Sequence, residues 1–155
     1  MAHIFSLNLS HGGVPKMPVQ RARLTFQGLA GDHQRHRHVH GGPERALCLF
    51  SLEVLLSLQA EGHPVYPVSM GEDLTISGLD WPRIEPDSRL QLGPCLVEIS
   101  QFTIPCDSIK GSFSDGRFRR VSPKVHPGRT RLYARVLRTG VLAVGDPVRV
   151  CALNQ

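Results

Sequence analysis

The sequence has few lysines, few aromatic residues and no long apolar run. Only three of its 155 residues are lysines, and aromatic residues make up 6% of the chain. Because so few rings can stack on bases and no helix carries a basic stripe, we expect no nucleic-acid partner. No stretch approaches the roughly 20 apolar residues of a membrane span, and the first residues lack the pattern of a signal peptide. We therefore expect a cytoplasmic protein with no membrane association.

The cysteines lack any C-x-x-C pairing, which argues against a zinc site or a redox disulfide. In the cytoplasm Cys48, Cys95, Cys106 and Cys151 should be thiols. Repeats and linkers are missing as well, so residues 1–155 are expected to form a single domain. The net charge of +5 comes almost wholly from arginines, whose planar donors match phosphates and carboxylates. A small anionic ligand is therefore favoured.

Glycine and proline are frequent, with 15 and 12 residues, and leave little room for long helices. Strand-like segments occupy residues 2–9, 22–26, 45–50, 68–80, 89–93, 95–100, 131–137 and 146–150. One helix is expected over "LEVLLSLQAE", with Ser51 as N-cap, Glu53 in the first turn and Gly62 at its end. Many short strands, one main helix and short helical turns predict a mostly β protein whose sheet closes into a distorted barrel.

The stretch "HRHVHGGPER" contains histidines at alternate positions, His36, His38 and His40. On a strand they would share one face and could bind a transition metal, although a solvated loop with incidental histidines is an alternative. The next residues suggest an anion site, because Gly41 and Gly42 allow backbone N–H groups to approach a ligand and Arg45 can pair with it. A tight glycine turn is the alternative.

Cys106 is the candidate reactive thiol. It follows a proline at the end of a strand-like run and precedes a polar loop containing glycine, where reactive thiolates are usually displayed. An inert, half-buried cysteine is the alternative. Cys48 and Cys95 lie inside apolar runs and are interpreted as small buried hydrophobes.

Four motifs in order, "GLAGDHQRHRHVHGGPERALCLFS", "GEDLTISGLD", "LGPCLVEISQFTIPC" and "YARVLRTGVLAVGD", resemble the MOSC domain family, which is named for the carboxy-terminal domain of molybdenum cofactor sulfurases. The resemblance spans residues 28–150 and implies a distorted β-barrel like that of pyruvate kinase. It also implies a molybdenum-cofactor (molybdopterin) site in which Cys106 ligates molybdenum or carries persulfide sulfur. Thr103 stands where the family has an arginine, and Asp73 stands where asparagine is usual.

The resemblance assigns further residues to this site. Asp32 and His40 would shape the site around Cys106, and Arg131 or Arg129 would supply the missing positive charge. The residues expected to bind the cofactor are Gly41, Gly42, Arg45, Glu72 and Arg131. Covalent pyridoxal phosphate is not expected, because none of the three lysines lies in a recognisable cofactor motif.

Three functions follow as alternatives. The protein could be a molybdenum-dependent reductase of N-hydroxylated compounds, which requires a separate electron-donor protein because the chain has no flavin, haem or iron–sulfur motif. It could instead be a carrier that accepts persulfide sulfur from a desulfurase. It could also be a small-anion-binding barrel in which Cys106 is inert. The oligomeric state stays open.

Overall fold

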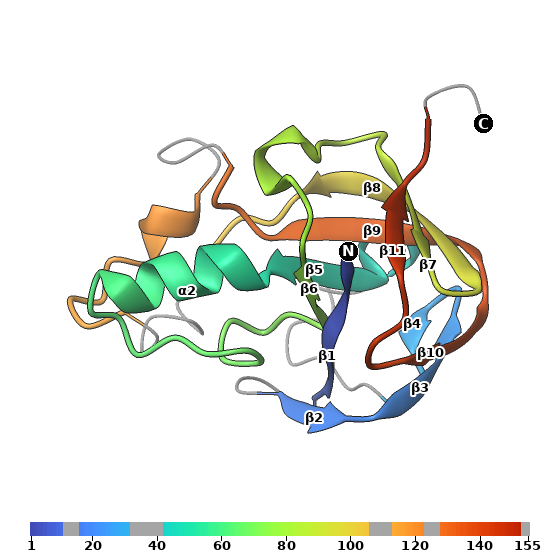
Figure 1. Cartoon of the computed structure of the whole chain (residues 1–155), viewed down its shortest axis with the longest axis horizontal. Coiled ribbons are helices and arrows are strands. Elements are labelled where there is room, and N and C mark those ends of the chain that lie inside the picture. The colour runs from blue at the N-terminus through green and yellow to red at the C-terminus, as the bar shows by residue number, and fades with distance from the viewer. Residues whose placement is uncertain (11–15, 32–41, 106–112, 123–127, 153–155) are drawn as a thin grey trace.

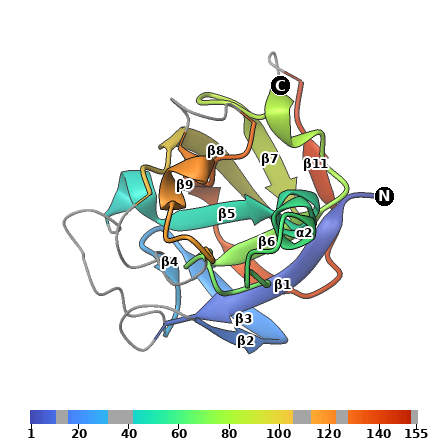
Figure 2. The same cartoon turned by 90° about the vertical axis from the view of Figure 1, so that its left-hand side faces the viewer.

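Two β-sheets and one α-helix build the protein in a computed structural model, which describes residues 1–10, 16–31, 42–105, 113–122 and 128–152 (Figures 1 and 2). Along the chain the elements are β1 His3–Leu9, β2 Met17–Val19, β3 Arg21–Thr25, β4 Gly28–Leu29, η1 Pro43–Arg45, β5 Leu47–Ser51, α2 Leu52–Ala60, β6 Leu74–Ser77, η2 Trp81–Arg83, β7 Arg89–Leu92, β8 Cys95–Phe102, η4 Phe118–Val121, β9 Leu132–Arg138, β10 Gly140–Ala143 and β11 Val148–Val150. The prediction of a mostly β protein with one main helix and short helical turns is confirmed.

The larger sheet has eight strands in the order β11-β7-β8-β9-β5-β6-β1-β2, and the smaller has the order β10-β3-β4. Neighbouring strands are antiparallel except for β5 and β6, which are parallel. A parallel pair needs a crossover, and α2 supplies it by running between β5 and β6. The starts of β5 and β6 consequently lie side by side, which brings the residues around position 48 next to those around position 73.

The predicted closed barrel is not found among the described residues. The large sheet curls until β1 meets the chain just before β11, where the His3–Pro147 bridge and the Ile4 N–H to Asp146 carbonyl hydrogen bond (2.9 Å) join them. The Val148 N–H also donates to the Ala2 carbonyl at 3.0 Å, but the pairing stays an isolated bridge and does not extend into a ladder. The curled sheet thus has β2 and β11 as edges.

Helix α2 matches its prediction closely. The Ser51 hydroxyl accepts a hydrogen bond from the Val54 N–H at 3.2 Å, and Gly62, with φ of 93°, follows the end of the helix. Leu55 and Leu58 point into the core. Among the residues that the structure describes, no helix has the length and apolar character needed to cross a membrane.

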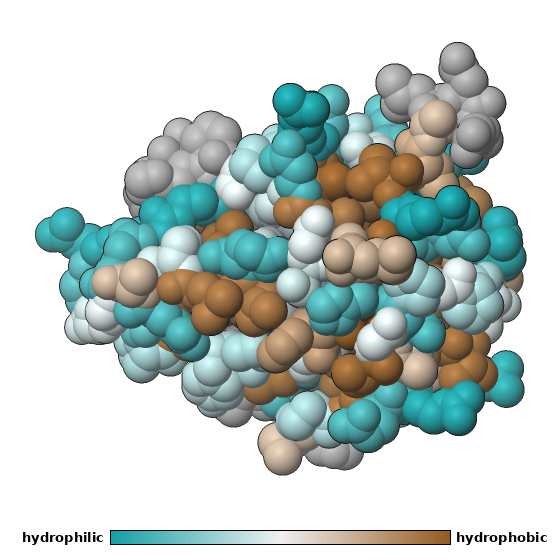
Figure 3. Space-filling view, in the orientation of Figure 1, coloured by the Kyte–Doolittle hydropathy of each residue, from teal (hydrophilic) through white to brown (hydrophobic). Residues whose placement is uncertain are grey.

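In the sequence of β9, Leu132, Ala134 and Val136 alternate with Tyr133, Arg135 and Leu137, which predicts a half-buried strand, and the structure follows this alternation with one exception. Leu132, Ala134 and Val136 are buried, as expected for the inner face. Tyr133 was expected on the opposite, half-exposed face but is also buried, because the Arg45 guanidinium covers its ring at 5.8 Å from the ring centre. On the face drawn in Figure 3, hydrophilic residues surround separate apolar patches.

Candidate functional site

Six buried residues form what we call the buried polar cluster. One residue precedes β2, one lies on β5 and two lie in the turn before β6. The last two lie next to each other, one directly after β8 and one directly before β9. All six are less than one-tenth exposed, and they are Lys16, Cys48, Glu72, Asp73, Thr103 and Arg131. Buried charges are rare unless they are paired or have a function, so this concentration marks the candidate site.

Asp73 holds the cluster together. One carboxylate oxygen pairs with the Lys16 ammonium, and the other accepts the Cys48 backbone N–H at 2.7 Å. The Asp73 N–H in turn donates to the Cys48 carbonyl at 2.8 Å. These three contacts hold Asp73 beside β5 and keep the Lys16 ammonium next to its carboxylate.

Glu72, the next residue, is fully buried. Its carboxylate accepts hydrogen bonds from the Met70 N–H and the Thr75 hydroxyl, both at 3.2 Å, while its own carbonyl accepts the Asn8 amide at 3.1 Å. Burial raises the pKa of Glu72 to about 7, against the opposing effects of these hydrogen bonds and of Arg131. The carboxyl group can therefore change its charge near neutral pH.

Arg131 is 3% exposed and only partly satisfied. Its Nη1 donates to the Met70 carbonyl at 2.7 Å, but Nε and Nη2 are buried with no hydrogen-bond partner within the described residues. The described part of the chain also shows no ion pair between Arg131 and Glu72, although Arg131 lowers the pKa of that residue. A buried guanidinium with free donors is costly, and an anionic ligand would relieve that cost.

The thiol of Cys48, a member of the buried polar cluster, lies 3.8 Å from the Thr103 hydroxyl. Burial raises its pKa to about 11, with Asp73 acting in the same direction and Arg131 and Lys16 opposing. The predicted burial of Cys48 is confirmed, while its polar surroundings were missed.

A groove of about 390 Å³ reaches the cluster from the surface. Lys16 and Ser6 lie in it, and exposed Met17 and Tyr66 stand at its sides. Val68 also lines the groove and has a φ of 84°, a conformation that β-branched residues rarely adopt. Backbone strain of this kind is concentrated at functional sites, which supports the groove as the entrance.

The predicted site residues divide into three groups. Glu72 and Arg131 both belong to the buried polar cluster, where Arg131 lowers the pKa of Glu72 against the effect of burial. Gly42, with φ of 90°, precedes η1, and Arg45 at the end of η1 lies over Tyr133. Outside the described residues lie Asp32, His36, His38, His40, Gly41 and Cys106.

Arg129, the other candidate for the missing positive charge, already has a partner. Its guanidinium pairs with the Glu61 carboxylate beyond the end of α2, and it is partly exposed. Of these two arginines, Arg131 is therefore the one that can bind an anion in the cluster. Sequence reasoning missed Lys16 and Cys48, although the rarity of lysine in this chain was a signal for the former.

Comparison with known proteins identifies the family, since the MOSC domain model matches residues 36–149. The chain belongs to the MOSC domain family. This MOSC protein is 28% identical to YflK of Bacillus subtilis strain 168 over 135 residues, which cover 86% of this chain and 60% of YflK. It is 32% identical to YiiM of Escherichia coli K12 over 94 residues, which cover 58% of this chain and 42% of YiiM. The match thus spans about half the length of these two relatives.

Two crystal structures of YiiM share the fold of this MOSC protein. The structure from Geobacillus stearothermophilus has a TM-score of 0.75 at 22% identity and covers 98% of this chain and 76% of its own. The structure from Escherichia coli has a TM-score of 0.73 at 23% identity, with 98% and 70% covered. The fold expected from the resemblance is therefore confirmed at the level of the MOSC family.

Proposed function

We propose that this MOSC protein binds the molybdenum cofactor, with Arg131 contacting the anionic group of the pterin and the Cys106 thiolate ligating molybdenum. The observation that carries the proposal is the buried Arg131 guanidinium, whose Nε and Nη2 have no partner among the described residues. These two N–H groups lie on one edge of the guanidinium, and such an edge suits bidentate binding of a phosphate.

The remaining charges of the cluster fit an anion. The Lys16–Asp73 pair is neutral overall, and the pKa of Glu72 near 7 leaves that carboxyl partly protonated at neutral pH. Arg131 is then the dominant uncompensated charge of the cluster, and its field is weakly screened because it is buried. A dianionic phosphate would be attracted more strongly than a neutral ligand.

The other residues have supporting roles in this proposal. Gly41, Gly42 and Arg45 would hold the outer part of the cofactor, while Asp32 and His40 would shape the surroundings of Cys106. A soft thiolate such as Cys106 suits molybdenum. When bound, the cofactor supplies a metal centre that exchanges electrons with a substrate, and a separate protein must provide the electrons. The reaction class we propose is reduction of N-hydroxylated compounds.

Elemental analysis and pterin fluorescence test the proposal, on protein made in a host that synthesises the cofactor. We expect wild type to contain stoichiometric molybdenum and pterin, Cys106→Ser to lose molybdenum, and Arg131→Met to lose both. Arg131→Met should still fold, because replacing an unpaired buried charge by an apolar side chain is often neutral or stabilising. Wild type without molybdenum or pterin would overturn the proposal.

The matched control is Arg83→Gln, which removes an exposed arginine that pairs with Asp80 at 3.2 Å. This variant should keep the molybdenum and pterin of wild type. If wild type lacks molybdenum but Cys106 accepts persulfide from a desulfurase and cysteine, the protein is a sulfur carrier instead. If Cys106 neither binds metal nor accepts sulfur, it is inert and the protein is a small-anion-binding module.

A further inference from the structure

A second cavity, of about 260 Å³, lies between η2, the end of β8 and the chain leading into β9. Thr130 and Leu132 line it, whereas the Arg131 side chain between them reaches the Met70 carbonyl in the buried polar cluster. Successive side chains of an extended segment point to opposite faces, so the cavity and the cluster lie on opposite sides of this segment. The cavity therefore lies apart from the buried polar cluster.

Apolar and aromatic side chains form most of its wall. Trp81 is fixed by a hydrogen bond from its indole N–H to the Thr130 carbonyl at 2.8 Å, and its ring packs edge-on against Phe50. Phe102 lines the cavity too and is 37% exposed, which is unusual for a residue this large and apolar. A rigid indole beside an exposed phenyl ring is a surface that favours a flat ring.

One buried polar group in the cavity, the Thr130 hydroxyl, makes no hydrogen bond with the described residues. The carboxylate of Glu85, an exposed residue, also lines the cavity and forms no ion pair with the described residues. A buried polar atom without a partner requires an explanation, and a ligand that hydrogen-bonds to it is one. No arginine or lysine lines the cavity in the described part of the chain.

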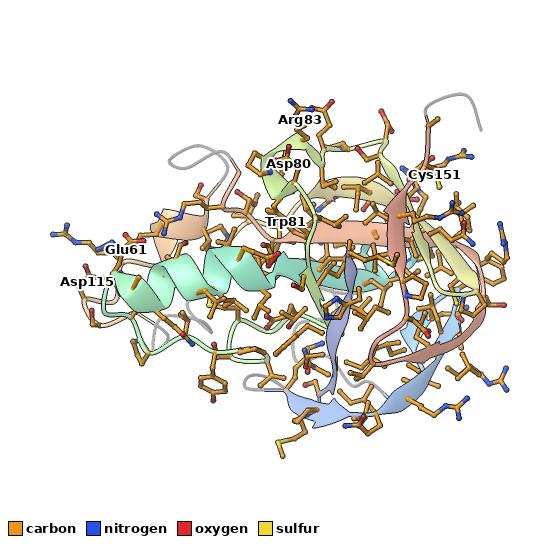
Figure 4. The ribbon with its side chains drawn as sticks, viewed as in Figure 1. Glu61, Asp80, Trp81, Arg83, Asp115 and Cys151 are labelled. Atoms are coloured by element: carbon orange, nitrogen blue, oxygen red, sulfur yellow. The ribbon has the colours of Figure 1, made fainter. Side chains whose placement is uncertain are left out.

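The nearest charged side chains of η2 point elsewhere. Figure 4 shows Asp80 and Arg83 at the outer surface, with Trp81 further inside. Asp80 and Arg83 pair with each other and are mostly exposed. Among the charged residues that the structure describes, only Glu85 lines the cavity, and it favours a cation over an anion although the whole chain carries a net charge of +5.

We propose that this cavity binds a small arylalkylamine, with the ring between Trp81 and Phe102, the ammonium group on Glu85 and a further polar atom on Thr130. The size is sufficient, because an engineered cavity of about 150 Å³ in another protein binds benzene. This site does not depend on the proposed cofactor, and a failure of either proposal leaves the other standing.

Trp81 is the only tryptophan of the chain, so its fluorescence reports directly on the cavity. Titration of the full chain with benzylamine should change this fluorescence saturably, with a Kd on the order of 1 mM, as expected for so small a ligand. Benzoate has the same ring with the opposite charge and should give no saturable change. A saturable fluorescence change with benzoate at the same concentration would overturn the proposal. The absence of a saturable change with benzylamine would overturn it too.

Variants separate the ring contact from the charge contact. Glu85→Gln and Phe102→Ala should each weaken benzylamine binding about fivefold or more, the scale of one desolvated charge or aromatic contact. Asp80→Asn removes a carboxylate from the same η2 region outside the cavity and should bind like wild type. Glu85 and Phe102 are both exposed, and thermal unfolding would verify that their variants fold. Unchanged affinity in Glu85→Gln would contradict the proposed ammonium contact.

Discussion

Asp73 and Cys48 hydrogen-bond to each other twice, with the Cys48 N–H donating to the Asp73 carboxylate at 2.7 Å and the Asp73 N–H donating to the Cys48 carbonyl at 2.8 Å. This double contact joins the parallel strands β5 and β6 at their starts. It also places the carboxylate where it pairs with Lys16. The buried polar cluster is therefore part of the sheet framework, and its charges affect stability as well as binding.

The Lys16–Asp73 pair should show strong energetic coupling. Lys16→Met leaves the buried carboxylate without the ammonium, and Asp73→Asn leaves the ammonium without the carboxylate, so each should lower the free energy of unfolding by about 3 kcal/mol or more. The double variant removes both charges and should lose less than the sum, as measured by urea unfolding. Losses that add within about 0.5 kcal/mol would show that the pair is not coupled.

Glu72 should make stability depend on pH. Its pKa of about 7 in the folded protein lies above the ordinary value of 4.5, so the folded state binds this proton more tightly than the unfolded chain. The resulting stability is fully present below pH 4.5 and is lost as the pH rises through 7. By linkage the loss is about 3 kcal/mol.

Glu72→Gln is the matched variant, because glutamine keeps the shape and cannot ionise. The free energy of unfolding of the variant minus that of wild type should rise across this pH window. Exposed carboxylates such as Glu61 and Asp115 titrate in both proteins and cancel in the difference. A difference that stays constant with pH would mean that the Glu72 carboxyl is ionised throughout.

Cys48 should resist alkylation in the folded protein. Burial raises its pKa to about 11, so little thiolate forms at mildly alkaline pH, and the side chain is shielded from reagents. Cys151, near the end of the chain and only half-buried, should react with iodoacetamide before Cys48 does. Peptide mass spectrometry before and after unfolding in urea would measure both. Equal rates for the two thiols in the folded state would contradict the burial of Cys48.

Gly28 should tolerate no side chain. Its φ is +119°, and an added Cβ would lie 2.5 Å from the carbonyl oxygen of Ala46, a backbone atom just before β5. Gly28→Ala should therefore cost more than about 2 kcal/mol of unfolding free energy. Gly62 has a similar φ of +93° but open space around it, so Gly62→Ala should cost about 1 kcal/mol. Equal thermal shifts in the two variants would contradict this account of Gly28.

Local signals in the sequence predicted the elements well, because they depend on neighbouring residues. Ser51 and Gly62 delimit α2, and period-two alternation located β9 except at Tyr133. The closed barrel depended on pairing between the two ends of the chain, which no local pattern encodes. In the structure that junction is an isolated bridge between His3 and Pro147.

The candidate site was predictable only in part for the same reason. Glu72 was named because it stands in a motif that resembles a known family, and Arg131 was named as a residue that could supply the positive charge missing at Thr103. The Lys16–Asp73 pair joins residues 57 positions apart, and the two residues of the Cys48–Asp73 contact are 25 positions apart. Such contacts are created by the parallel pairing of β5 and β6 and the approach of the chain before β2, so they become visible only in the folded molecule.

Native mass spectrometry of wild-type protein from a host that makes the cofactor tests the central claim most directly. The account predicts that the intact chain carries an additional mass equal to one molybdenum-bearing pterin, and that Arg131→Met carries none. A wild-type chain with no added mass would contradict the account. An addition of one sulfur atom in place of the cofactor would contradict it too and would identify a persulfide carrier.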